Sequence, residues 1–234
     1  MDQLATGGFW YIAFLLSTSL HEAAHGFAAL RLGDRTAYEA GQVTLDPIPH
    51  IRREPLGMVV VPLVSFLAGG WMIGWASVPF SREWASRYPR RSALMSLAGP
   101  ASNLALALLA AIAIRLGMLF GVFVAPESIN HSQVVAAAAG SGVFVPVALF
   151  VSVLFSLNLL LCIFNLLPVP PLDGSGAIPL FLGPSRAQAY LSWIRNPAFS
   201  LVGLVLAWRL FDVIYGPLHL FAINMLFLGV AHYR

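Results

Sequence analysis

Five long runs of apolar residues divide the sequence, and shorter polar or proline-rich segments separate them. A helix needs about 20 mostly apolar residues to cross the hydrocarbon core of a bilayer. Two shorter runs near the end of the chain are joined by Gly216-Pro217, a dipeptide typical of a tight turn. The pattern predicts membrane helices, with a closing helical hairpin over residues 198–233. The runs are 8–30, 92–123, 134–167, 199–215 and 218–233.

A sixth apolar segment, 57–80, contains several helix-breaking prolines and glycines. The loops that flank it, 31–55 and 81–91, are both rich in arginine. Basic loops favour the cytoplasmic side of a membrane, so both loops can lie there only if 57–80 enters and leaves on the same side. We therefore expect a re-entrant hairpin, an external N-terminus, five spans and an internal C-terminus. Because 57–80 is also long enough to span, a sixth transmembrane helix is the alternative.

The amino-acid composition is also that of a membrane protein. Apolar residues make up 59% of the chain and charged residues only 10%, whereas a soluble domain carries roughly 25% charge. This excludes a disordered chain, a coiled coil and a disulfide scaffold. The net charge of +3 comes from arginines in loops, which suits a lipid bilayer surface and predicts no nucleic-acid partner. We predict an all-α polytopic membrane protein that forms one domain over 1–234, with a small β element expected in 37–55.

The first apolar run contains the sequence LHEAAHG, which places three ionisable residues inside a predicted span. His21 and His25 are four residues apart and therefore share one face of a helix. Two imidazoles in this arrangement can bind a single zinc ion, and Glu22 beside them can accept a proton from a water molecule. Ionisable residues within a span are energetically expensive and usually mark a functional site.

A catalytic zinc site needs a third protein ligand. Asp173, Asp212 and His219 are the candidates at membrane depth. Asp212 follows Arg209 by three residues and can pair with it, while His219 lies near the predicted turn. Asp173 ends the stretch NLLPVPPLD, whose prolines break the longest run, and broken backbone at membrane depth is tolerated where it lines a polar cavity. Asp173 is therefore the preferred ligand, with helix capping as its alternative role.

Together these motifs resemble the site-2 protease family of intramembrane zinc metalloproteases, in its compact bacterial form without a PDZ domain. The resemblance covers residues 8–182 and includes the segments AGPASN and NLLPVPPLDG. It implies that His21, His25 and Asp173 hold one zinc ion per chain. It also implies that Glu22 is the general base.

The same resemblance implies that Asn103 and Asn165 hold the substrate backbone or its oxyanion. The alternative for each asparagine is a hydrogen bond between helices without a catalytic role.

The function implied is hydrolysis of a peptide bond in or near the transmembrane helix of a single-span membrane protein, in the process of regulated intramembrane proteolysis. The implied location is the bacterial cytoplasmic membrane, with the active site towards the cytoplasm. An edge strand in 37–55 or the re-entrant hairpin is expected to pair with the unwound substrate. Three alternatives stay open: a membrane metallohydrolase acting on a lipid or prenylated peptide, a non-catalytic relative that sequesters substrates, and a transporter that relays protons or ions.

Overall fold

A computed structural model describes residues 3–194 and 196–233 of the chain. Four long helices dominate the described part: α1 (Gln3–Leu32), α6 (Pro89–Leu119), α7 (Val145–Asn165) and α10 (Pro197–Leu226). By length and composition α6, α7 and α10 can cross a membrane. Helix α1 is similar in length to α6 and α10 and contains the ionisable residues of the LHEAAHG motif. The all-α membrane class is therefore confirmed.

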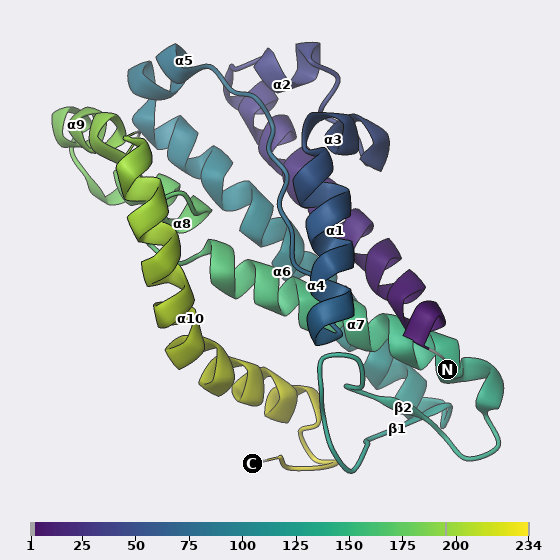
Figure 1. Cartoon of the computed structure of the whole chain (residues 1–234). Helices are drawn as coiled ribbons and strands as arrows, with labels where there is room; N and C mark the ends of the chain where they lie inside the picture. Colours follow the sequence, from purple (N-terminus) through teal and green to yellow (C-terminus); the bar gives the residue numbers. More distant parts are fainter. Residues whose placement is uncertain (1–2, 195, 234) are drawn as a thin grey trace.

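Helices α1, α6 and α7 pack against one another, and α10 lies beside them (Figure 1). Their shared core contains Trp10 and Phe14 of α1, Ala110 and Ile114 of α6, and Val153 of α7. Small residues such as Ala110 allow helix backbones to approach closely in a membrane. Much of the outward surface of α6 and α10 is apolar and exposed, as expected for helices that contact lipid.

Residues 57–80 form the re-entrant hairpin that the sequence predicts. A π-helical turn, η1 (Leu56–Val60), leads into α4 (Val61–Gly69), and an extended segment returns beside α4 to α5 (Arg82–Arg87) (Figure 1). The two limbs meet closely: a Cβ at Gly57 would lie 2.2 Å from the carbonyl oxygen of Trp75. At the open end the hydroxyl of Ser77 donates to Glu54 Oε1 over 2.6 Å. The chain therefore enters and leaves at the same end of the molecule.

The predicted helical hairpin over 198–233 is wrong, because α10 continues through Gly216 and Pro217 as one bent helix (Figure 1). A proline inside a helix removes one hydrogen bond and kinks the axis, and here the turns on either side remain helical. Four long helices are therefore present in the described chain instead of five or six. After Leu226 the helix ends where Arg115 donates to the carbonyls of Leu226 and Leu228.

This single helix also contradicts the expectation that the N-terminal and C-terminal ends of the chain lie on opposite sides of the membrane. The hydroxyl of Tyr233 donates to the carbonyl of Pro126 over 2.7 Å, so residues 227–233 lie beside the loop between α6 and α7. That loop and the start of α1 lie at the same end of the molecule (Figure 1). The four long helices therefore return the chain to the end of the molecule at which it began.

The β element exists, but not in 37–55. Strand β1 (Phe123–Val124) pairs antiparallel with β2 (Ala136–Ala137) in the loop between α6 and α7. This loop ends with the short 3-10 turn η2 (Gly142–Phe144). Residues 37–55 instead contribute to the short helices α2 (Thr36–Glu39) and α3 (Pro47–Arg53). The side chain of Asp46 caps α3 by accepting from the backbone N–H of Ile48, and Pro47 suits the first helical turn. A strand pair there was therefore the wrong prediction.

Three short elements follow α7 on the side where α1 ends. They are α8 (Asp173–Ala177), η3 (Ile178–Phe181) and α9 (Pro184–Ile194). Helix α8 packs against α6, and α9 leads into α10 (Figure 1). Helix α10 packs against the proline-rich break through its Gly203. A Cβ at this position would lie 1.8 Å from the carbonyl oxygen of Pro170. This arrangement fixes the start of α8 next to α1 and α6.

Candidate metal centre

Helix α1 presents His21, Glu22 and His25 on its buried side. Their exposed fractions are 7%, 6% and 6%. The spacing of four residues places the two imidazoles one turn apart, and their Nε2 atoms lie 3.0 Å from each other. Both rings therefore point at one place in the interior of the protein.

Asp173 reaches the same place from the proline-rich break after α7. Leu172 is extended and α8 begins at Asp173. The next residue is glycine for a steric reason, since a Cβ on Gly174 would lie 2.2 Å from the carbonyl oxygen of Leu166. This close turn directs the Asp173 carboxylate towards α1, where its Oδ2 lies 3.2 Å from His21 Nε2 and 3.3 Å from His25 Nε2.

These three separations fit a zinc ion. Zinc binds imidazole nitrogen and carboxylate oxygen at about 2.0–2.2 Å in tetrahedral geometry, which places neighbouring ligand atoms about 3.3 Å apart. The observed distances between the ligand atoms of His21, His25 and Asp173 run from 3.0 to 3.3 Å. Two imidazoles and one carboxylate are also a donor set that catalytic zinc sites use.

The outer nitrogen of each imidazole has its own acceptor. His21 Nδ1 donates to Asn103 Oδ1 over 2.5 Å, and His25 Nδ1 donates to the carbonyl oxygen of Met95 over 2.8 Å. In these tautomers each Nε2 carries a lone pair, and both lone pairs face Asp173 Oδ2, which has no hydrogen-bond partner in the described structure. Three converging acceptors repel one another unless a cation lies between them, so this arrangement suits a metal ion.

Helix α6 closes over this place with a glycine. A Cβ on Gly99 would lie 2.3 Å from His25 Nε2 and 2.5 Å from His21 Nε2. Any larger residue would occupy the space beside the ligand atoms. The absence of a side chain at this position therefore keeps room for an ion and for a group bound to it.

The remaining predicted site residues fall into two groups. Glu22 lies between the two histidines in α1, and its carboxylate has no hydrogen-bond partner or ion pair among residues 3–194 and 196–233. Asn103 is fully buried and holds His21. Asn165 lies in the last turn of α7, where its side chain donates to the carbonyl of Leu161 over 3.0 Å, with no recorded contact to the ligand atoms. The structure thus joins Asn103 to the centre by a hydrogen bond, whereas the role of Asn165 stays a prediction.

The alternative ligands lie elsewhere. Within the described residues the group of side chains that could hold a metal ion consists of His21, His25 and Asp173, without Asp212 or His219. The expected ion pair between Asp212 and Arg209 is also missing from the ion pairs of the described chain. Both of these side chains are exposed on α10.

Sequence reasoning missed two residues that support this centre. Asn158, in the middle of α7, accepts from Asn103 over 2.8 Å and donates to Ser17 Oγ over 2.8 Å. All three are buried between α1, α6 and α7. The available signal was an asparagine in the middle of an uncharged run, where a polar side chain requires a partner.

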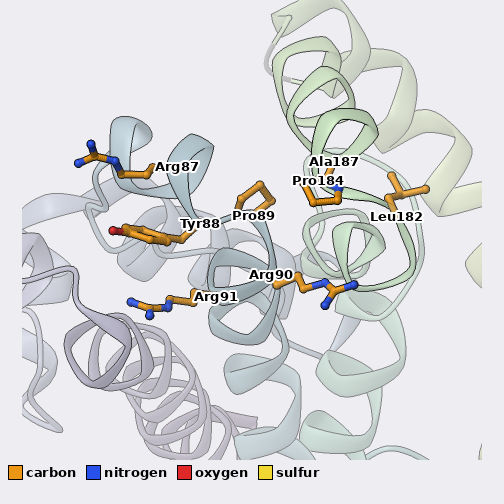
Figure 2. A pocket seen from close by; sticks show the side chains of 8 residues that line it. All are labelled: Arg87, Tyr88, Pro89, Arg90, Arg91, Leu182, Pro184 and Ala187. Atoms are coloured by element: carbon orange, nitrogen blue, oxygen red, sulfur yellow. The ribbon is translucent and has the colours of Figure 1, made fainter.

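Apart from the metal centre, a concavity of about 330 Å³ lies between the start of α6 and the start of α9. Figure 2 shows that its arginines do not converge: Arg90 extends towards the α9 side, whereas the guanidinium groups of Arg87 and Arg91 lie with Tyr88 on the other side. Arg91 is already engaged, since it donates to the carbonyl of Leu32 and stacks on Tyr88. The metal centre is therefore the stronger candidate site.

Comparison with known proteins agrees with this geometry. The family described as peptidase family M50 matches residues 9–210. The chain is 34% identical over 164 residues to "Putative zinc metalloprotease YwhC" of Bacillus subtilis, a match covering 70% of this chain and 64% of that protein. It is 31% identical over 193 residues to "Putative zinc metalloprotease Rip2" of Mycolicibacterium smegmatis, covering 82% of this chain and 64% of that protein.

The protein of the same name from Mycobacterium tuberculosis is 32% identical over 220 residues, with 94% of this chain and 73% of that protein covered. The chain therefore spans just under two thirds of the length of the first two relatives. No solved structure matches the chain.

Proposed function

Because this chain belongs to peptidase family M50, we propose that it is a zinc metalloprotease that hydrolyses a peptide bond in or near the transmembrane helix of a membrane-protein substrate. One observation carries the proposal: Nε2 of His21, Nε2 of His25 and Oδ2 of Asp173 converge within 3.3 Å of one another beside Glu22. These residues lie in a bundle of long apolar helices, so the peptide bond to be cut must come to membrane depth.

Zinc held by His21, His25 and Asp173 supplies two kinds of chemistry, since it acidifies water and polarises a carbonyl oxygen. Glu22 acts as the general base: its carboxylate accepts a proton from the attacking water and delivers that proton to the leaving amide nitrogen. A carboxylate without a fixed hydrogen-bond partner suits this task, because it is free to accept and release the proton.

The surrounding residues hold the ligands in place. Asn103 and the carbonyl of Met95 accept from the Nδ1 atoms of the two imidazoles, which keeps both Nε2 atoms available. The role proposed for Asn103 is therefore orientation of His21 instead of contact with the substrate oxyanion. Asn165 donates to the carbonyl of Leu161, and contact of its side chain with the substrate backbone stays part of the proposal.

A substrate helix must unwind before its carbonyl can be attacked, because helical carbonyls are occupied by hydrogen bonds. An unwound segment can pair with an extended segment of the protease as an added strand. Residues 37–55 are largely helical and turn-like and offer no strand for this. The extended return limb of the re-entrant hairpin, residues 71–80, is the segment that we assign to this role.

We also propose that the centre opens towards the cytoplasm of a bacterial cell. The arginine-rich segments 31–55 and 81–91 lie where α1 ends and α6 begins, at the end opposite the β1–β2 hairpin (Figure 1). His21 and His25 lie in the half of α1 nearest that end. Basic residues favour the cytoplasmic face of a membrane, which supports this orientation.

The test is to purify the detergent-solubilised chain, count zinc per molecule and offer a panel of single-span membrane proteins. Wild type should cleave one or more of them, while Glu22→Gln keeps its zinc and loses cleavage. A small lipid or a prenylated peptide in the same panel tests the metallohydrolase alternative. Cleavage of such a substrate in place of a membrane helix would refute the proposal. The proposal would also be refuted if zinc-loaded wild type cleaved none of the membrane proteins, or cleaved them no faster than Glu22→Gln.

A further inference from the structure

The polar network behind His21 extends beyond Asn103 to the middle of α7. We propose that Asn158 is a positioning residue that acts through Asn103 to hold His21 in the tautomer that binds zinc. This inference rests on the zinc site of the proposed function, but not on any substrate. Asn158 and Asn103 are both fully buried, with no exposed area.

The direction of each hydrogen bond in this network follows from a main-chain acceptor. The carbonyl oxygen of Leu154 lies 2.8 Å from Asn158 and can only accept, so the amide nitrogen of Asn158 must face it. The second hydrogen of that nitrogen is donated to Ser17 Oγ. The carbonyl oxygen of Asn158 is left facing Asn103 at 2.8 Å, and it too can only accept.

Asn103 consequently has no freedom to rotate its amide. Its nitrogen must point to Asn158, so its oxygen must point to His21. Because that oxygen can only accept, the proton of neutral His21 must be on Nδ1. The lone pair of His21 is then on Nε2, which faces His25 and Asp173.

Loss of Asn158 would remove this constraint. The amide nitrogen of Asn103 would retain only the carbonyl of Ser17 at 3.5 Å, a weak hydrogen bond. The amide could then turn its nitrogen towards His21, which would favour the proton on Nε2 and block zinc binding there. His25 needs no such support, because its acceptor is the main-chain carbonyl of Met95, which cannot flip.

The experiment measures zinc affinity of the full detergent-solubilised chain, without substrate, by competition with a chelator. Asn158→Leu removes the hydrogen bonds at similar volume, and we expect its zinc affinity to fall about 10- to 100-fold, as is usual when a group supporting a metal ligand is lost. The matched control is Ser156→Ala in the same helix. Ser156 is equally buried and its hydroxyl has no hydrogen-bond partner within the described part of the chain, so zinc affinity should stay at the wild-type value.

Two further variants separate positioning from general packing. Asn158→Asp in its protonated form still donates to Leu154 and accepts from Asn103, so it should restore zinc affinity even if it lowers the melting temperature. In an Asn103→Ala background, Asn158→Leu should cause no additional loss of zinc affinity, because the residue through which it acts is already gone. A Co²⁺-loaded sample gives a visible spectrum that reports ligand geometry for each variant.

Wild-type zinc affinity in Asn158→Leu would overturn the inference. So would an equal loss in Ser156→Ala, an equal loss in Asn158→Asp, or a full further loss on the Asn103→Ala background. If Asn158→Leu does not fold, the pair Asn158→Asp and Asn103→Ala decides, with affinity retained in the first and reduced in the second. If wild type binds no zinc, the proposed function itself is refuted. If wild type and Asn158→Leu bind zinc equally well, only the role of Asn158 is refuted.

Discussion

Replacement of Gly99 by alanine is a direct test of the space between the two histidines and the aspartate. The added Cβ would lie 2.3 Å from His25 Nε2 and 2.5 Å from His21 Nε2, whereas ordinary contacts begin near 3.4 Å. The imidazoles or α6 must therefore move by about 1 Å, while metal-ligand distances tolerate deviations of only about 0.2 Å. Zinc affinity should fall at least 100-fold, at or beyond the upper range for losing a supporting group.

The expected loss of zinc affinity cannot be explained by a loss of helix stability. Alanine favours a helix over glycine by about 1 kcal/mol, so Gly99→Ala should not weaken α6 through its backbone. The control is Gly8→Ala in α1, because the Cβ that it adds meets no described atom within 4 Å apart from the adjoining backbone of its own helix. Zinc per chain and chelator competition are measured on both purified variants, together with their melting temperatures without metal.

We expect Gly8→Ala to bind zinc like wild type and Gly99→Ala to lose it while remaining folded. Undiminished zinc affinity in Gly99→Ala would refute the reasoning, because the ion could then not lie where Nε2 of His21, Nε2 of His25 and Gly99 meet.

Three other substitutions test separate parts of the structure. Glu22→Gln should reduce cleavage of a single-span substrate by at least about 100-fold while zinc stays bound, since general base catalysis is worth 10²–10⁴; zinc loss in this variant would assign Glu22 to the metal instead. Gly174→Ala should lower zinc affinity by about tenfold or more, because its Cβ would lie 2.2 Å from the carbonyl oxygen of Leu166 and push Asp173 away. Gly183→Ala is its control, because apart from its chain neighbours no described atom lies within 4 Å of the added Cβ, and equal zinc affinity in the two variants would contradict the prediction. Asp34→Asn should lower the free energy of unfolding by about 1–3 kcal/mol, because Asp34 Oδ2 accepts from the backbone N–H of Ser81 and an amide nitrogen there would not. An unchanged melting temperature in Asp34→Asn would show that this link between α1 and α5 is not needed.

The sequence predicts the three residues of the candidate metal centre because the signals are local. His21 and His25 are fixed on one helix face by spacing alone, and an aspartate after a proline-rich break stands out in a membrane protein. The re-entrant hairpin is likewise predictable, since its glycines and prolines are visible in the sequence and the arginines flank it. The structure places Nε2 of both histidines and Oδ2 of Asp173 together, which the sequence could only suggest.

Features decided by tertiary packing could not be predicted. Gly216-Pro217 is typical of a turn, yet α10 continues through it with a bend because the turns on either side keep their hydrogen bonds. The strand pair forms within 123–137 instead of 37–55. There the hydroxyl of Ser152 accepts from the N–H groups of Val134 and Val135 and fixes the loop on α7. Asn158 has no periodic signature, so only its position between α1 and α6 shows its partner.

X-ray absorption at the zinc edge of the purified wild-type chain tests the central claim most directly. The account predicts one zinc per chain, bound by two imidazole nitrogens at about 2.0–2.1 Å and by oxygen ligands at similar distance. Asp173→Ala should lose an oxygen ligand or the ion itself, and His25→Ala should lose an imidazole. A wild-type chain that binds no zinc, or a zinc spectrum that is unchanged in both variants, would contradict the account.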